Sequence, residues 1–427
     1  MVTEADYGQY VLYVDGDELK KFVASKEQCV FGYGYEWENE NVIHLHFYRP
    51  IHAFGREIKV LFSKDKSQSK EDDILFVDVL PDGTAKVGCY EVTIIPERES
   101  LYSRSRGLLE VDILQNKRVL IVGLGSGGSA IAIELAKAGV GQFAIVDFDR
   151  VELHNLSRHI CTVNDLGRLK TDAVYDALKG KNPYVSIDKF PININRNIDI
   201  LRDQIQKADI VLCCTDNNQS RFLISKILKE EEKIGIFGRA VTRAEGGDVF
   251  IYRPGCACYC CLVGNDWYDQ TSEEITDLRS ARRSGRIAAY VSEDDATAMV
   301  QVGLGADIEP INNMIVKLAL VELSRGTQSG ITSLEDEFKQ NYYLWANRRE
   351  RHYANWGAFD NSEGLPTIMR WYGVDIEKEE KCALCGNKIE LDLGKEYEDV
   401  LIKMGGMLIN KTSLTLNEID AINTDGN

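Results

Sequence analysis

A glycine-rich turn between an apolar run and a helical segment constrains the fold of this chain more than any other feature. Gly123, Gly125 and Gly128 match the pattern G-x-G-x-x-G directly after the apolar run 119–122. In this pattern the first glycine makes a tight turn, the second admits a phosphate to the backbone and the third lets helix and strand pack closely. Asp147 follows at the end of the next apolar run, where it can accept hydrogen bonds from ribose hydroxyls. The sequence therefore predicts a nucleotide site.

Apolar runs alternate with helical spacing around this turn. The further runs lie at 143–146, 208–214 and 234–237, and helical spacing covers 130–138. This alternation predicts a parallel sheet with helices on both faces, which is an α/β, doubly wound, Rossmann-like fold. We expect this domain to occupy residues 99–330.

The flanking regions differ from the central one. Residues 1–98 hold short β-branched and aromatic runs separated by turn-forming clusters such as 15–17 and 81–83, which predicts a small β-rich domain. We find no chemical motif in it. Residues 331–427 are mixed and form a C-terminal segment with a cysteine pair.

Two cations and a carboxylate follow the glycine turn. A dinucleotide needs little beyond the helix N-terminus, whereas a triphosphate that is cleaved needs cations along its chain and a carboxylate for Mg²⁺. Arg158 and Lys170 supply the cations, and Asp216, at the end of another predicted strand, supplies the carboxylate. This favours ATP with Mg²⁺. An NAD-dependent oxidoreductase and a scaffold without catalysis are the alternatives from other classes.

Six linked motifs resemble those of the ThiF/MoeB and ubiquitin-activating superfamily in order and rough spacing. They are Tyr102-Ser103-Arg104, the turn 123–128, Val146-Asp147-Phe148-Asp149, Asn155-Leu156-Ser157-Arg158, Gly167-Arg168-Leu169-Lys170 and Thr215-Asp216-Asn217. The resemblance covers about residues 100–325, together with the cysteine pair near 382. His159 follows Arg158 where relatives usually have Gln, and we expect little consequence.

The resemblance implies roles for these residues. Asp147, with Asp149 in the same motif, contacts the nucleotide and binds ribose. The phosphates are held by Asn155, Arg158 and Lys170, and Asp216 handles Mg²⁺ and the adenylation step.

The resemblance also implies an activity. It is ATP-dependent adenylation of the C-terminal carboxylate of a ubiquitin-like protein, for transfer to a conjugating or acceptor protein. Arg104 resembles an arginine that reaches the γ-phosphate from the second subunit, which implies a homodimer. The extended flanking regions favour a prokaryotic conjugation pathway, and activation of a sulfur-carrier protein for thiamine or molybdenum-cofactor synthesis is the alternative.

Two C-x-x-C pairs predict a structural zinc site. Cys258 with Cys261, and Cys382 with Cys385, offer the four thiolates of a closed tetrahedral site. Relatives with Cys-Tyr-x-Cys-Leu and a later pair bind zinc in this way. Cys256 and Cys260 are interleaved with the first pair and can compete as ligands, and four free thiols are the alternative.

The nucleophile that many ubiquitin-activating relatives use for acyl transfer is missing from its expected loop. Residues 265–308 contain no cysteine. Three interpretations stay open: the enzyme stops at the adenylate, Thr297 or Ser292 forms an ester, or Cys256 or Cys260 serves instead. We favour the first.

Composition excludes several classes. The formal net charge of the 427 residues is −17, which argues against nucleic acid as a partner because duplex binding depends on Lys and Arg. No apolar run is long enough to span a bilayer, so we expect no membrane contact. The 11 cysteines, without an export signal at the acidic N-terminus, indicate a reducing compartment, and we expect a cytoplasmic protein.

Overall fold

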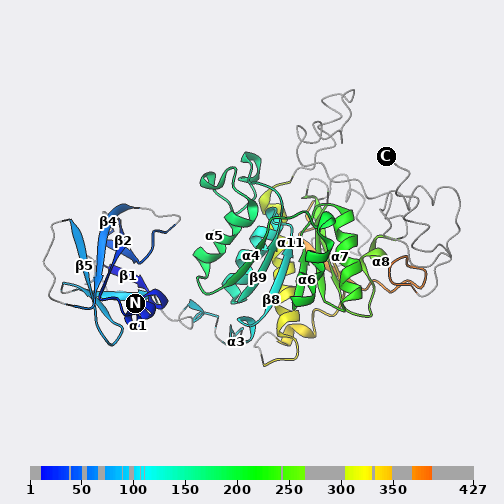
Figure 1. Ribbon diagram of the computed structural model, residues 1–427. Helices are drawn as coiled ribbons and strands as arrows, with labels where there is room; N and C mark the ends of the chain where they lie inside the picture. The colour runs from blue at the N-terminus through cyan, green and yellow to red at the C-terminus, as the bar shows by residue number, and fades with distance from the viewer. Residues whose placement is uncertain are drawn as a thin grey trace, which may run out of the picture. The chain divides into compact units, whose positions relative to one another are not determined.

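The chain divides into two compact units, Met1–Arg104 and Ser105–Asn427 (Figure 1). The computed structural model describes residues 11–37, 40–50, 55–65, 73–88, 90–95, 101–105, 107–109, 111–241, 244–264, 303–328, 332–348 and 368–386.

The first unit is a closed barrel, in agreement with the predicted β-rich domain. Its strands, in sequence order, are β1 (Val11–Asp15), β2 (Cys29–Trp37), β3 (Val42–His46), β4 (Arg56–Ser63), β5 (Ile74–Val79), β6 (Ala85–Val87) and β7 (Tyr90–Ile95). The barrel closes because β1 pairs in parallel with both β3 and β7. Alternate side chains such as Leu12 and Val14 point into its core.

One local prediction in this unit is wrong. The cluster 15–17, which we expected to form a turn, begins the helix α1 (Gly16–Ala24). Asp15 is the N-cap, and its carboxylate accepts hydrogen bonds from the backbone N–H groups of Asp17 and Glu18 at 2.9 and 3.0 Å. Asp serves at helix starts and in turns by the same local bonds, so the cluster alone did not separate the two.

The second unit is built on an eight-stranded sheet. Its order is β10-β9-β8-β11-β12-β13-β14-β15. The strands are β8 (Arg118–Val122), β9 (Gln142–Val146), β10 (Ser186–Phe190), β11 (Ile210–Cys213), β12 (Gly235–Ala240), β13 (Gly246–Tyr252), β14 (Tyr342–Ala346) and β15 (Arg370–Val374). The first five in the sheet order are parallel and the last three are antiparallel. The chain winds outward from β8 in one direction and resumes at β11 on its other side, so the switch point lies between β8 and β11.

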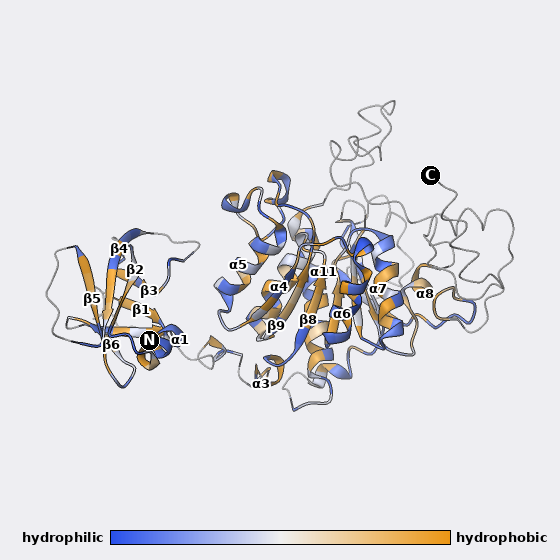
Figure 2. Cartoon of the chain, in the orientation of Figure 1, coloured by the Kyte–Doolittle hydropathy of each residue, from blue (hydrophilic) through white to orange (hydrophobic). Residues whose placement is uncertain are grey.

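Helices cover both faces of this sheet, which confirms the α/β prediction. The described part of the unit contains the helices α3 (Val111–Leu114), α4 (Ser126–Ala138), α5 (Lys170–Lys181), α6 (Ile198–Lys207), α7 (Asn218–Glu230), α8 (Tyr259–Val263) and α11 (Gly305–Ser324), with 3₁₀ turns η2 (Leu153–Asn155), η3 (Val163–Asp165), η4 (Ile194–Arg196) and η7 (Thr332–Glu335). Val119 and Ile121 of β8 pack with α4, α5 and α11. Leu120 and Val122 pack with α6, α7 and α8 on the opposite face. The apolar strands lie between helices whose outer faces are polar (Figure 2).

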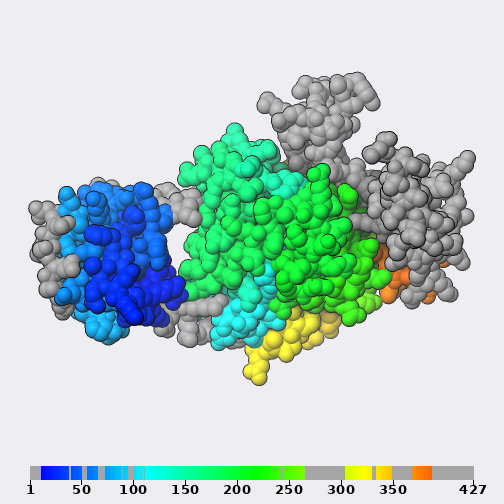
Figure 3. Space-filling model, viewed as in Figure 1, coloured from blue at the N-terminus to red at the C-terminus, as the bar shows by residue number. Residues whose placement is uncertain are grey.

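Parts of the predicted C-terminal segment complete this sheet. β14 pairs with β13, and β15 pairs with β14. The long helix α11 is largely buried, and from the side drawn in Figure 3 the yellow segment that holds it reaches the surface only at its lower end. Within the described residues, none of the helices combines the length and hydropathy that crossing a bilayer requires.

Candidate functional site

The glycine turn has two glycines that the fold needs and one that it does not. Gly123 has a φ of +92°, and a Cβ there would lie 2.7 Å from the carbonyl oxygen of Cys214. A Cβ at Gly128 would lie 1.9 Å from the carbonyl oxygen of Gly123. A Cβ at Gly125 would meet nothing within 4 Å. The space at Gly125, beside the N-terminus of the 13-residue helix α4, is therefore available to a ligand.

Asp147 holds this turn in place. Its two carboxylate oxygens accept hydrogen bonds from the backbone N–H groups of Leu124 at 2.7 Å and Asp149 at 2.8 Å. Burial raises the pKa of the Asp147 carboxyl above its usual range, against the opposing charge of Lys170. Each oxygen keeps a further lone pair, so the carboxylate can still accept bonds from a ribose.

His159, which we expected to be of little consequence, also supports the turn. Its Nδ1 accepts a hydrogen bond from the backbone N–H of Cys161 at 3.1 Å, so its Nε2 donates to the carbonyl oxygen of Leu124 at 2.6 Å. Burial lowers the pKa of His159 below its ordinary value of 6.5. The ring is therefore a neutral donor that fixes the backbone between the first two glycines.

Lys170 is a buried cation among carboxylates. It is the first residue of α5, is 8% exposed, and donates from Nζ to Asp149 Oδ2 at 2.9 Å. Although burial lowers its pKa, the charges of Asp147, Asp149 and Asp216 raise it above the ordinary value. The side chain is therefore a fixed positive charge at neutral pH.

A cavity of about 550 Å³ brings most of the predicted site residues together. This volume lies within the range of 300 to 1,000 Å³ that is typical of small-molecule sites. The predicted residues that line it are Gly123, Gly125, Asp147, Asp149, Asn155, Arg158, Lys170 and Asp216. Gly128 lies beneath the turn. Arg104 is exposed and is the last residue of the first unit, so its role remains a prediction.

Arg158 and Asn155 enter the cavity from the loop after β9. The Arg158 guanidinium has no ion-pair partner in the part of the chain that the structure describes, which leaves it available for an anion. Asn155 uses its amide oxygen locally, because that oxygen accepts the backbone N–H of Glu152 at 2.8 Å. Its amide nitrogen can donate.

Asp216 lies in the turn after β11, which hydrogen bonds from two neighbouring side chains hold in place. The neighbouring Asn217 caps α7 by accepting the backbone N–H of Ser220 at 2.8 Å. Arg221, which is 4% exposed, donates from Nη2 to the carbonyl oxygen of Thr215 at 2.7 Å. Asp216 itself is exposed to the cavity. The arrangement places a carboxylate at the switch point, opposite the glycine turn.

Asn312 and Arg239 are among the polar residues of the cavity that sequence reasoning missed. Asn312 of α11 is 3% exposed, and its amide nitrogen has no hydrogen-bond partner among the described residues. Arg239 at the end of β12 makes an ion pair with the buried Asp248. Neither lies in a sequence motif, and the fold brings both to the cavity from distant parts of the chain.

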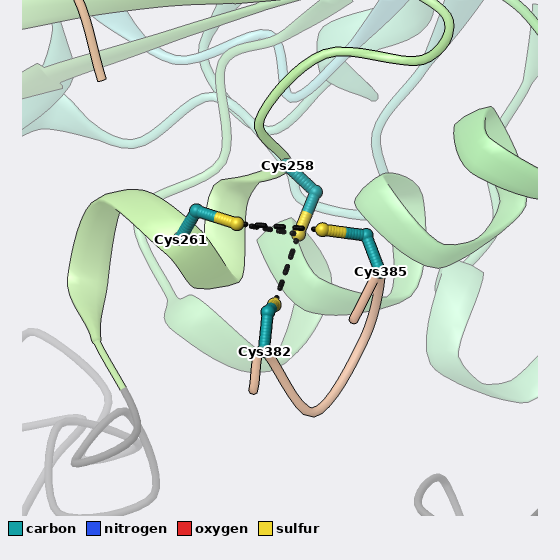
Figure 4. Close-up of side chains that lie close together, drawn as sticks. All are labelled: Cys258, Cys261, Cys382 and Cys385. Atoms are coloured by element: carbon teal, nitrogen blue, oxygen red, sulfur yellow. Dashed lines mark hydrogen bonds between the residues drawn. The ribbon is translucent and has the colours of Figure 1, made fainter. Parts of the chain in front are cut away.

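The four predicted metal-binding cysteines form one buried cluster. The Sγ atoms of Cys258 and Cys382 are 3.5 Å apart, those of Cys261 and Cys385 are 3.3 Å apart, and those of Cys258 and Cys261 are 3.8 Å apart (Figure 4). A tetrahedral ion with Zn–S bonds of about 2.3 Å holds its sulfurs about 3.8 Å apart. The cluster therefore fits the donor set and the size of a zinc ion.

The remaining described thiols differ in their surroundings. Burial raises the pKa of Cys161 to about 12, and it also raises the pKa of Cys213 and of Cys214, which lines the cavity. These thiols are poor nucleophiles at neutral pH. Cys260 is buried beside the cluster and Cys256 is exposed. Thr297 and Ser292 lie outside the described residues.

Curated relatives resemble this chain over part of its length. It is 34% identical over 287 residues to "Adenylyltransferase and sulfurtransferase MOCS3" of Caenorhabditis briggsae, covering 66% of this chain and 58% of that protein. It is 38% identical over 153 residues to "Molybdopterin-synthase adenylyltransferase" of Escherichia coli, covering 35% and 60%. It is 31% identical over 177 residues to "Ubiquitin-like modifier-activating enzyme 5" of Caenorhabditis briggsae, covering 38% and 41%.

The chain thus spans about two fifths of the length of that last relative. The model of the ThiF family matches residues 101–352, which is more than half of the chain and contains the whole cavity, and the chain therefore belongs to the ThiF family.

Proposed function

We propose that this chain uses ATP to adenylate the C-terminal carboxylate of a small ubiquitin-like protein. One observation carries the proposal: a single cavity contains an open backbone cradle at Gly125, the cations Arg158 and Lys170, and the carboxylate of Asp216. The pyrophosphate of a dinucleotide would not need both of these cations and the carboxylate. A triphosphate that is cleaved uses all of them.

The reaction follows from these charges. A carboxylate oxygen of the carrier forms a bond to the α-phosphorus of ATP as the bond from that phosphorus to the bridging oxygen breaks. Pyrophosphate leaves with the electron pair, and an acyl-adenylate remains. Arg158, Lys170 and the helix α4 N-terminus neutralise the phosphates, so that one anion can attack another. Asp216 would hold Mg²⁺, which supplies further positive charge to the leaving pyrophosphate.

The relatives support two kinds of carrier. One relative is named for the activation of a ubiquitin-like modifier, "Ubiquitin-like modifier-activating enzyme 5", and another for molybdopterin synthase, "Molybdopterin-synthase adenylyltransferase". We favour the ubiquitin-like carrier, and a sulfur-carrier protein is the second candidate. In either case we propose a homodimer in which Arg104 of each chain serves the other, acting in the cytoplasm.

We propose that the carrier leaves the enzyme as the acyl-adenylate, without forming a covalent bond to a cysteine of this chain. The thiol at the cavity, Cys214, is held protonated by burial, and the exposed Cys256 is only two residues from a cluster cysteine. The adenylate would then pass to a separate conjugating or acceptor protein. The four-cysteine cluster is proposed to bind Zn²⁺ as a structural ion, because all four donor atoms are engaged with one another.

ATP–pyrophosphate exchange tests the function. The small protein that co-purifies with the chain should support exchange that requires Mg²⁺ and a free C-terminal carboxylate, and removal of its last residues should abolish the signal. Absence of carrier-dependent exchange, together with saturable NADH binding, would overturn the proposal in favour of an oxidoreductase.

A further inference from the structure

We infer that Arg239 is the residue that binds and orients the carboxylate of the acyl substrate. This inference rests on the proposed function, because it names a further part of the same site. It begins from a cation that lines the nucleotide cavity yet belongs to none of the motifs that predicted it.

The strand order places Arg239 next to Asp216 along the sheet edge, on the side away from the glycine turn. Along the sheet edge, the end of β9 carries Asp147, the end of β8 carries the glycine turn, and the end of β11 leads to Asp216. β12 is the next strand, and its Phe237 pairs with Cys213, so Arg239 lies level with the turn that holds Asp216. The positions proposed for the ribose, the phosphates and the metal-binding carboxylate are thus followed along the sheet by the guanidinium of Arg239.

Arg239 is already oriented. Its Nε donates to Asp248 Oδ1 at 2.9 Å and its Nη2 to Asp248 Oδ2 at 2.6 Å. Asp248 is 2% exposed and also accepts the hydroxyl of Tyr342 at 3.2 Å. Nη1 has no hydrogen-bond partner among the described residues, and the side chain is 23% exposed. The clamp therefore fixes the guanidinium while leaving donors for a ligand.

A carboxylate is the ligand that these donors fit. The planar guanidinium matches carboxylate geometry, and the pairing is charge-assisted. A free carboxylate that approaches three phosphates is repelled by them, so it needs a cation of its own on the approach side. Arg239 supplies this cation in the same cavity, in addition to Arg158 and Lys170, which we propose bind the phosphates.

A purely structural role is the competing explanation. Arg239 and Asp248 are directly opposite each other on β12 and β13, so their ion pair would also stabilise the sheet. Arg253 is a matched control. Its Nη2 lies 2.6 Å from Glu322 Oε1, and the side chains of Arg253 and Glu322 are 23% and 2% exposed. In the Arg239 pair, Nη2 lies 2.6 Å from Asp248 Oδ2, and the side chains of Arg239 and Asp248 are 23% and 3% exposed. Arg253 does not line the cavity.

Titration calorimetry on the full chain separates the two roles. The probes are a synthetic peptide that ends in Gly-Gly with a free carboxylate, and the same peptide with a C-terminal amide, each added to protein saturated with α,β-methylene-ATP and Mg²⁺. We expect Arg239→Gln to bind the nucleotide within about twofold of wild type and the free peptide at least about tenfold more weakly, as a lost charged hydrogen bond implies. Arg253→Gln should bind both like wild type.

Three outcomes would overturn the inference. They are unchanged peptide binding in folded Arg239→Gln, equal loss in Arg253→Gln, and wild-type binding of the amide as tight as that of the acid. If Arg239→Gln does not fold, Arg239→Gln with Asp248→Asn removes both buried charges and should give the same selective loss. Failure of the proposed function is seen separately, as wild-type protein that binds no ATP analogue or supports no carrier-dependent exchange.

Discussion

At the scale of single residues, the site depends on one buried positive charge. Lys170 is 8% exposed, and Asp147, Asp149 and Asp216 all act on it. Without the lysine these carboxylates would repel one another and the phosphates of the nucleotide.

Lys170→Met should therefore lower the rate of pyrophosphate exchange by about 100-fold or more, which is the usual effect of removing one preorganised electrostatic contact. Lys170→Arg is the matched control, and it should retain more activity because the charge remains. Exchange by Lys170→Met within about threefold of wild type would contradict the assignment.

His159 gives a prediction that depends on pH. Its folded-state pKa lies below the ordinary 6.5 because of burial, so the hydrogen bond that it donates to Leu124 as a neutral ring stabilises the fold above that pH. This contribution is lost as the pH falls through the folded-state pKa, because the charged ring can no longer accept the N–H of Cys161. ATP affinity of the wild type should fall with it.

A glutamine offers the same N–H donor without titrating in this range. His159→Gln should thus bind ATP normally at neutral pH and lose less affinity in acid, whereas His159→Leu should bind weakly throughout. The measurement is the dissociation constant of ATP between pH 5 and 8. Identical profiles for wild type and His159→Gln would contradict the role of the ring.

At the scale of elements, local sequence patterns correctly predicted those strands, turns and helices that depend on interactions between neighbouring residues. The run at β8 and the pattern of Gly123, Gly125 and Gly128 were sufficient to predict strand, turn and helix, because each depends on neighbouring residues. The barrel closure through parallel pairing of β1 was not predictable, since it joins strands that are far apart in sequence. Arg239 and Asn312 were missed for the same reason: nothing in their own segments marks them, and only the assembled sheet and α11 bring them to the cavity.

Substitutions at two glycines of the turn should affect fold stability and ATP binding separately. Gly128→Ala should destabilise the fold by at least about 2 kcal/mol, because its Cβ would lie 1.9 Å from a backbone oxygen. Gly125→Ala should leave the melting temperature nearly unchanged, since its Cβ meets no protein atom, yet weaken ATP binding by at least about tenfold. Thermal melts and ATP titrations of both variants check this. Normal ATP binding by Gly125→Ala would argue against a phosphate at that position.

At the scale of the whole molecule, the four-cysteine cluster joins distant parts of the chain. Cys258 is the N-cap of α8 and Cys261 lies within that helix. Cys382 and Cys385 follow β15, and the loop that holds them is also fixed where Lys229 donates to the carbonyl oxygen of Leu384 at 2.7 Å. The spacing of the two C-x-x-C pairs, together with the resemblance to zinc-binding relatives, predicted these four cysteines as ligands.

Metal analysis tests the cluster. Purified protein should contain one Zn²⁺ per chain, and Cys385→Ser should lose the metal and melt several degrees lower, since about 1 kcal/mol already shifts a domain of 150 to 250 residues by 2 to 4 °C. Cys161→Ser should keep the metal. Stoichiometric zinc in Cys385→Ser would contradict the assignment.

The central claim is that one cavity holds a nucleoside triphosphate with its metal rather than a dinucleotide. Titration calorimetry with ATP and with NAD⁺, each with and without Mg²⁺, tests it most directly. We predict saturable ATP binding that Mg²⁺ strengthens, loss of that Mg²⁺ effect in Asp216→Asn, and no saturable binding of NAD⁺. Tight NAD⁺ binding that ignores Mg²⁺, alongside absent ATP binding, would contradict the claim.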